Sequence, residues 1–169
     1  MYRSYNIAAK VTNYNGTVFR SRLEARWAVY LDELGVCYEY EPEFFQLDSR
    51  NYLPDFWVKD DDSEEYLWLE IKPTYPTEIE IETMNELCNI SHCPGMIIYG
   101  SIPHPEQHME YGFCSTVGHI YFGSCWEKTE YGYRVWFDGW NTFDKSFPTF
   151  DRNFLHVDQA LEAAIKFSF

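Results

Sequence analysis

Apolar residues between Arg20 and Gly35 recur at the spacing of an α-helix. They form one stripe with a period of about 3.6 residues, made up of Leu23, Trp27, Tyr30, Leu31 and Leu34. Ser21 is a suitable N-cap, Glu24 is a suitable capping-box partner three residues later, and Gly35 is a typical helix stop. The pattern therefore predicts one amphipathic helix over residues 20–35.

Strand patterns and a second helix follow this first helix. Strands are expected over residues 37–41, 44–47, 52–58, 66–72 and 96–99, where apolar side chains alternate with polar ones or form short runs. The third and fourth of these are joined by a short acidic link, so they are expected to pair as an antiparallel hairpin. Residues 77–89 are expected to form a helix, because Thr77 is a suitable cap and acidic residues follow it in the first turn.

The order of these elements predicts an α/β fold in which helices pack on a mixed sheet. Beyond residue 99, aromatic strands are expected over 118–126 and 133–137, and an amphipathic helix over 157–167 closes the chain. The chain has 169 residues and contains no internal repeat or low-complexity linker. It is therefore expected to form a single domain over residues 1–169.

Charge narrows the choice of partners. The chain has 13 Lys and Arg residues against 27 Asp and Glu residues, a net charge of −14. Residues 41–90 contain 14 of the acidic residues and only three basic ones, so a broad basic footprint for nucleic acid is missing. Phosphate contacts are therefore expected only near the N-terminus, which is not net negative, and the candidate nucleic-acid-binding residues are Arg20, Arg22 and Arg26.

Composition argues against several other classes of protein. Hydrophobic residues make up 46% of the chain and charged residues 24%, which disfavours intrinsic disorder. No run approaches the roughly 18 apolar residues of a membrane span, and residues 1–6 lack the apolar core of a signal peptide. No membrane partner and a cytoplasmic location are therefore expected. The five cysteines include no Cys-x-x-Cys pair and match no standard zinc spacing, so reduced thiols are expected.

The two strands of the expected hairpin hold the residues with the clearest chemistry. Because side chains alternate along a strand, Glu70 and Lys72 point to the same face. Asp55 on the neighbouring strand can face the same side, close to Glu70. Mg²⁺ takes oxygen ligands and commonly uses one or two carboxylates together with water and substrate phosphate. Asp55 and Glu70 are therefore candidate metal ligands with the carbonyl of Ile71, and Lys72 is a candidate to orient or activate a water molecule.

Two of these assignments have simpler alternatives. Glu70 and Lys72 also fit an ordinary ion pair on a half-exposed strand. Glu24 lies at the edge of the apolar stripe of the first helix, where a carboxylate needs a partner. It is either the capping-box partner of Ser21 or a third carboxylate directed at the site of Asp55 and Glu70.

A helix with Glu24, then Pro-Asp at residues 54–55 and Glu-Ile-Lys at residues 70–72, resembles the PD-(D/E)XK nuclease superfamily. The resemblance covers about residues 17–100, and residues 19–27 and 52–56 are similar to small members from bacteria and their phages. It implies a restriction-endonuclease-like αβββαβ core, with residues 101–169 as an aromatic, β-rich extension that ends in a helix. It also implies that Asp55 and Glu70 bind Mg²⁺ (with Mn²⁺ as a substitute), that Lys72 serves the attacking water, and that Glu24 helps to position metal or water.

Two functions follow as hypotheses. The resemblance implies a Mg²⁺-dependent endonuclease or exonuclease that hydrolyses phosphodiester bonds of DNA in the cytoplasm, which is the host's for a phage protein. RNA as the substrate and a homodimer remain open alternatives. The second hypothesis is an acidic, phage-encoded binding protein that inhibits a host defence protein or a nucleic-acid-binding protein without catalysis. The net charge of −14 favours this second hypothesis, because an acidic surface suits a basic partner.

Overall fold

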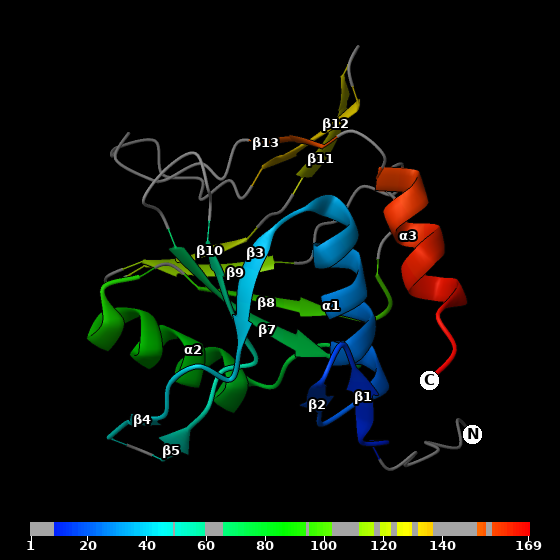
Figure 1. Ribbon diagram of the computed structural model, residues 1–169. Helices are drawn as coiled ribbons and strands as arrows, with labels where there is room; N and C mark the ends of the chain where they lie inside the picture. The colour runs from blue at the N-terminus through cyan, green and yellow to red at the C-terminus, as the bar shows by residue number, and fades with distance from the viewer. Residues whose placement is uncertain are drawn as a thin grey trace, which may run out of the picture.

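The computed structural model contains three helices and thirteen strands among the residues that it describes (Figure 1). Those residues are 9–48, 50–59, 66–93, 95–102, 112–116, 119–122, 125–129, 132–136, 152–154 and 157–169. The helices are α1 (Arg22–Leu34), α2 (Glu78–Ser91) and α3 (Val157–Lys166). The strands are β1 (Thr12–Tyr14), β2 (Thr17–Phe19), β3 (Cys37–Tyr40), β4 (Phe45–Gln46), β5 (Asn51–Tyr52), β6 (Phe56–Lys59), β7 (Tyr66–Lys72), β8 (Gly95–Tyr99), β9 (Gly112–Thr116), β10 (His119–Phe122), β11 (Cys125–Thr129), β12 (Gly132–Trp136) and β13 (Arg152–Phe154). Within these ranges, no helix has the length and apolar character needed to cross a membrane.

A six-stranded mixed sheet with the order β10-β9-β8-β7-β6-β3 forms the centre of the fold. Neighbouring strands are antiparallel except β7 and β8, which are parallel and are connected through α2. Helices α1 and α3 lie side by side on one face of the sheet, and α2 lies on the other (Figure 1). The remaining strands form the hairpins β1–β2 and β4–β5 and the sheet β11-β12-β13. The protein therefore belongs to the mixed α/β class, as the sequence predicts.

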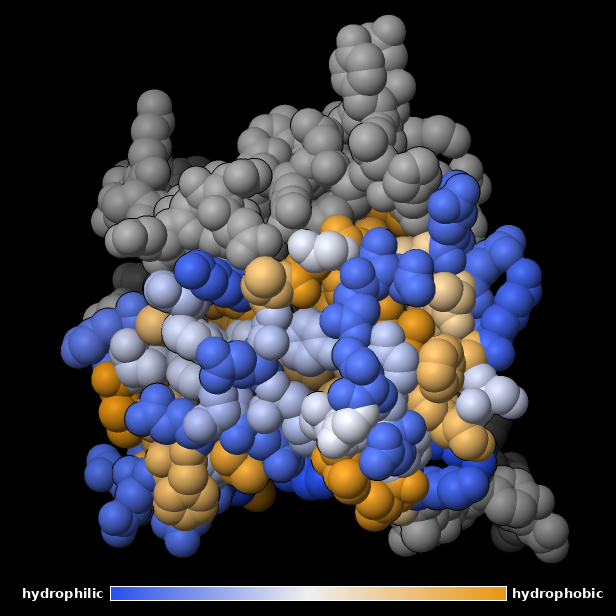
Figure 2. All heavy atoms as spheres, in the orientation of Figure 1, coloured by the Kyte–Doolittle hydropathy of each residue, from blue (hydrophilic) through white to orange (hydrophobic). Residues whose placement is uncertain are grey.

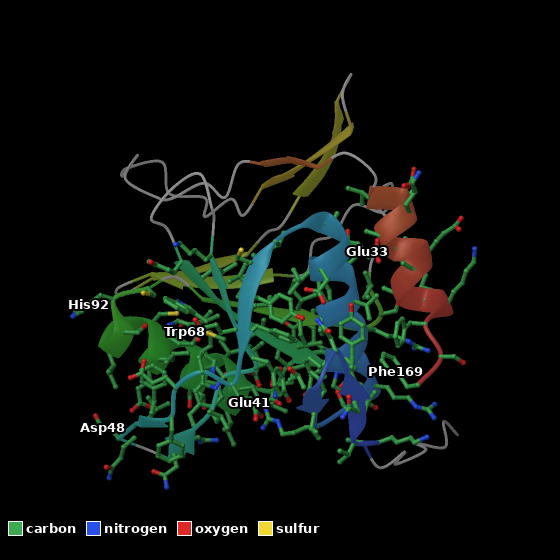
Figure 3. The ribbon with its side chains drawn as sticks, viewed as in Figure 1. Glu33, Glu41, Asp48, Trp68, His92 and Phe169 are labelled. Atoms are coloured by element: carbon green, nitrogen blue, oxygen red, sulfur yellow. The ribbon has the colours of Figure 1, made fainter. Side chains whose placement is uncertain are left out.

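Strand β7 is buried on both faces, and its side chains divide between the two helix layers. Leu67, Leu69 and Ile71 belong to the core beneath α1 and α3, whereas Trp68 packs with residues of α2. Figure 3 shows Trp68 between the sheet and α2. Central strands of this kind are normally apolar throughout. Glu70 is the exception, because it is charged and yet only 4% exposed.

Helix α1 begins and ends at the residues that its caps predict. Oγ of Ser21 accepts the main-chain N–H of Glu24 at 3.1 Å, and Gly35 ends the helix with a φ of 67°, a conformation that favours glycine. The apolar stripe packs on the sheet and on α3, where Ala28 and Ala164 are completely buried. Small side chains allow the two helices to approach closely, and α1 is thereby fixed over the sheet.

Helix α2 is capped as predicted but is longer at its C-terminal end. Thr77 is the N-cap and forms a capping box with Glu80. The helix continues to Ser91, two residues beyond the expected end, and the left-handed residue after it is His92, with a φ of 56°. Met84 is buried against the sheet, so α2 holds the first-turn residue Glu80 beside the end of β7.

The single strand predicted over residues 52–58 is wrong, because the segment contains two short strands. Strand β5 ends at Tyr52 and pairs with β4, whereas β6 begins at Phe56 and pairs with both β3 and β7. Pro54 lies between them and has no N–H to donate to a strand ladder. Asp55 consequently lies directly before β6 and not within a strand, although β6 and β7 do form the expected antiparallel hairpin.

The single strand predicted over residues 118–126 is also wrong. Strand β10 ends at Phe122 and pairs with β9, while β11 begins at Cys125 and pairs with β12. Two aromatic strands with a short connection have the same pattern as one long strand, and residue 118 lies outside the described residues. The β1–β2 hairpin is not among the predicted elements, although Asn15 and Gly16 have the positive φ values, 48° and 83°, that an Asn-Gly turn requires.

Candidate active site

Asp55 and Glu70 lie together in the interior, with only 2% and 4% of their surfaces exposed. The register of β6 and β7 pairs Phe56 with Leu69, which brings the residue before Phe56 next to the residue after Leu69. The main-chain N–H of Asp55 donates a hydrogen bond to Oε2 of Glu70 at 3.1 Å. Buried carboxylates are costly unless their oxygens are paired, so the donors around them define the site.

The two carboxylate oxygens of Glu70 have different partners. Oε2 accepts the N–H of Asp55 and also the hydroxyl of Tyr52, which lies at 2.8 Å. Oε1 pairs with Nζ of Lys72 at 2.6 Å, so Glu70 and Lys72 face the same side of β7, as strand alternation predicts. Lys72 also lies 3.5 Å from Oε1 of Glu80 in the first turn of α2. Because Glu70 is buried, this pair is not an ordinary surface ion pair.

The two carboxylate oxygens of Asp55 also have different partners. Oδ2 accepts the main-chain N–H of Ile71 at 2.8 Å, and Oδ1 accepts Nη2 of Arg20 at 2.5 Å. Arg20 lies in the link between β2 and α1, and its Nε is 2.5 Å from Oε1 of Glu41, which follows β3. Figure 3 shows Glu41 at the end of the sheet near which α1 begins. Asp55 and Glu70 thus each have one oxygen that accepts from neutral donors and one oxygen that is paired with a cation.

Burial and mutual repulsion control the protonation of the site. Burial, followed by the charge of Glu70, raises the pKa of Asp55 to about 8, although the Ile71 N–H and Arg20 act in the opposite direction. Burial lowers the pKa of Lys72, but the charge and hydrogen bond of Glu70 raise it by more, so the net shift is upward. Lys72 is therefore an ammonium group at neutral pH, which suits it to donate hydrogen bonds and stabilise negative charge rather than to accept a proton.

Glu24 is buried, with 7% of its surface exposed. Its carboxylate forms hydrogen bonds at the start of α1 and does not contact Glu70 or Asp55 through any of them. Oε1 accepts the hydroxyl of Ser21 at 2.6 Å, and Oε2 accepts the hydroxyl of Tyr40 at 2.5 Å and the main-chain N–H of Arg20 at 3.1 Å. Glu24 is therefore bonded to the residues that start α1, but it does not complete the expected capping box, because it accepts the main-chain N–H of Arg20 and not that of Ser21. Its charge still contributes to the raised pKa of Asp55. In the described ranges, no three Asp, Glu, His or Cys side chains are grouped to hold a metal ion, and a role of Glu24 as a third carboxylate of the site stays a prediction.

The three arginines predicted to bind nucleic acid are in different environments. Arg20 is part of the site through its ion pairs with Asp55 and Glu41. Arg22 is exposed at the start of α1, and Arg26 is half-buried, with an Nε that has no hydrogen-bond partner among the described residues. Only Arg20 therefore contacts a predicted metal ligand.

Three residues that hold the site together are not among the predicted site residues. Tyr52 binds Glu70, Tyr40 binds Glu24, and Glu41 binds Arg20. A buried carboxylate signals that some donor must be near, but it does not say which one. Tyr52 had one further signal, because it lies in the same short segment as the Pro-Asp pair.

The pair Asp55 and Glu70 fits a hard divalent cation. The N–H groups of Asp55 and Ile71 fix one oxygen of each carboxylate, and the remaining oxygens, Oδ1 and Oε1, already attract the cations Arg20 and Lys72. Mg²⁺ commonly needs only one or two carboxylates because water completes its coordination. The carbonyl of Ile71 and the carboxylate of Glu24 stay predictions as further ligands.

Comparison of the sequence with known proteins assigns no family to the chain. No protein-family model matches the chain, and no curated protein matches its sequence.

Proposed function

We propose that the protein is a Mg²⁺-dependent nuclease that hydrolyses phosphodiester bonds of DNA. One observation is central to this proposal: Asp55 and Glu70 are buried side by side, and Lys72 binds the oxygen of Glu70 that the neutral donors leave available. Burying two adjacent carboxylates lowers the stability of the folded protein. Binding of a metal ion between the two carboxylates would be a function that explains why the protein keeps this destabilising pair.

The arrangement of elements supports the same proposal. Helix α1 is followed by the antiparallel strands β3, β6 and β7, then by α2 and the strand β8, which is parallel to β7. This order and pairing support the restriction-endonuclease-like αβββαβ core that the resemblance implies, with the β4–β5 hairpin inserted. We propose that the two folds are the same.

The residues of the site have distinct roles in the proposed reaction. Asp55 and Glu70 would hold Mg²⁺, or Mn²⁺ in its place, through Oδ1 and Oε1. The metal would supply a Lewis acid for the phosphodiester and lower the pKa of a water molecule. Lys72, as an ammonium, orients the attacking water and stabilises the negative charge that develops on the phosphate. Tyr52 and the N–H of Ile71 keep the two carboxylates in fixed orientations.

Cleavage assays test this proposal directly. The purified protein is incubated with plasmid, single-stranded DNA and RNA in Mg²⁺, in Mn²⁺ and in EDTA. Asp55→Ala, Glu70→Ala and Lys72→Ala are each expected to lower the cleavage rate by about 100-fold or more, whereas Glu24→Gln is expected to be milder.

The matched control is Glu162→Gln, which removes an exposed carboxylate from a surface ion pair of α3. It is expected to cleave at the wild-type rate. Absence of any divalent-dependent cleavage by the wild type, or full activity of Asp55→Ala and Glu70→Ala, would overturn the proposal.

The net charge of −14 favours the second candidate function, a phage-encoded acidic protein that inhibits a host defence or nucleic-acid-binding protein. Such a binder uses its surface charge, which salt screens. It has no need for the buried pair Asp55 and Glu70. A tight, salt-sensitive complex with a basic protein that persists in Asp55→Ala, together with no cleavage by the wild type, would favour this function.

A further inference from the structure

We infer that Arg20 is a displaceable counter-cation of the metal site. In the metal-free protein it occupies Oδ1 of Asp55, it leaves that oxygen when a divalent cation binds, and it then contacts a phosphate group of the substrate. This inference rests on the proposed nuclease function and assigns to Arg20 a part that neither the motif nor the fold specifies.

The hydrogen bonds of the site leave one carboxylate oxygen of Asp55 able to bind a metal ion. Oδ2 is fixed by the main-chain N–H of Ile71 at 2.8 Å, a donor that cannot move without breaking β7. Oδ1 is the oxygen that can take a new ligand, and Nη2 of Arg20 already lies 2.5 Å from it. A divalent cation on the same oxygen would be only a few ångströms from the guanidinium and would repel it strongly.

Arg20 can leave Asp55 without disturbing the fold. Its side chain is 52% exposed, whereas that of Asp55 is 3% exposed, so the guanidinium moves toward solvent and opens no cavity in the core. Its main-chain N–H donates separately to Glu24 and Tyr40, at 3.1 and 3.0 Å, which keeps the start of α1 in place.

The released guanidinium stays close to the reacting phosphate. Glu41 holds Nε of Arg20 at 2.5 Å, and this second ion pair tethers the side chain beside the site. Guanidinium groups bind phosphate oxygens in a bidentate manner. Metal binding therefore makes the site more positive and frees a phosphate-binding group at the same time, which couples the affinity for metal to the affinity for substrate.

Metal affinity provides a test that does not depend on activity. Isothermal titration with Mn²⁺ compares wild type, Arg20→Gln and Lys166→Gln, a control that removes one exposed cation from an ion pair of α3. Arg20→Gln is expected to bind Mn²⁺ about tenfold more tightly, because no competing cation remains on Oδ1. The control is expected to bind Mn²⁺ like wild type.

Two further measurements complete the experiment: the affinity for DNA and the NMR signal of the Arg20 side chain. With Ca²⁺ replacing Mg²⁺ to prevent turnover, Arg20→Gln is expected to bind a short DNA duplex several-fold more weakly than wild type. In wild-type protein with ¹⁵N-labelled arginine, one Nε–H resonance is expected to shift during a Mg²⁺ titration. This measurement remains decisive if the Arg20 variant does not fold.

Each outcome has a separate meaning. If wild type binds no Mn²⁺, the proposed function fails and this inference fails with it. If wild type binds Mn²⁺ but folded Arg20→Gln binds it equally or less tightly, or no arginine resonance shifts, the inference alone is overturned and Arg20 merely supports Asp55. Tighter Mn²⁺ binding with unchanged DNA affinity would overturn the phosphate contact.

Discussion

Main-chain groups fix the two buried carboxylates of this protein. The N–H of Ile71 binds Asp55, and the N–H of Asp55 binds Glu70, so the backbone of β7 and of the residue before β6 determines where one oxygen of each lies. Lys72 and Arg20 are longer and partly exposed, and they can move without altering that frame. At the scale of single residues, the site therefore has a rigid part, formed by the main-chain donors, and an adjustable part, formed by Lys72 and Arg20.

The raised pKa of Asp55 predicts a pH dependence of stability. Its pKa rises from 3.8 to about 8 on folding, because of burial and the charge of Glu70. An acid whose pKa is raised in the folded state holds a proton that the unfolded chain has lost, so the free energy of unfolding falls as pH increases from about 4 to about 8. In metal-free protein this contribution has a slope of at most about 1.4 kcal/mol per pH unit.

Urea denaturation between pH 4.5 and 8 in EDTA measures this contribution. Asp55→Asn is expected to lose it, so its stability should fall less steeply with pH than that of wild type. The control Asp158→Asn, an exposed position in the first turn of α3, should keep the wild-type slope. Parallel pH profiles for wild type and Asp55→Asn would contradict the prediction.

At the scale of elements, the close packing of α2 on β8 determines where Glu80 lies relative to Lys72. Gly95 in β8 has no side chain, and a Cβ there would lie 2.3 Å from Sδ of Met84 and 2.6 Å from Sγ of Cys88. Helix α2 therefore lies directly on the backbone of β8. This contact places the first turn of α2 beside the end of β7.

Gly95→Ala is accordingly expected to lower the free energy of unfolding by about 1–3 kcal/mol, because the added methyl group overpacks this contact. In a Met84→Ala background the same methyl group should cost less, since the nearer of the two sulfur atoms is then absent. The double-mutant cycle, measured by urea denaturation, tests the contact. Additive effects of the two substitutions would show that α2 does not rest on Gly95.

At the scale of the whole molecule, the net charge of −14 limits how DNA can be bound. On the face shown in Figure 2, hydrophilic residues cover much of the described surface and apolar residues form separate patches. Among the predicted phosphate-binding residues, Arg20 is paired with two carboxylates and Arg26 is half-buried. DNA affinity is therefore expected to be modest and to depend on a divalent cation.

The salt dependence of DNA binding tests this distribution of charge. Replacing Arg20, Arg22 and Arg26 together by Gln is expected to weaken binding and to reduce the slope of log affinity against log salt by about 0.9 for each phosphate of B-DNA that the variant fails to neutralise. The slope is measured at constant Ca²⁺, with Lys166→Gln as the control. An unchanged slope in the triple variant would place the phosphate-binding residues on another surface.

The sequence by itself determined the local features of this protein. The stripe and caps of α1, the cap of α2 and the alternation along β7 are visible because the spacing of residues along a helix or a strand is fixed by backbone geometry. The shared face of Glu70 and Lys72 follows from the same rule. The proximity of Asp55 to Glu70 follows from the predicted hairpin.

Only the tertiary structure decided which groups surround the two carboxylates. Pro54 divides the expected strand, the chain returns through β4 and β5, and Tyr52 thereby reaches Glu70 from 18 residues away. Arg20 meets Asp55 across 35 residues, because the start of α1 lies at the same end of the sheet as the start of β6. Contacts of this kind depend on sheet register and on where each element ends, which the local pattern does not specify.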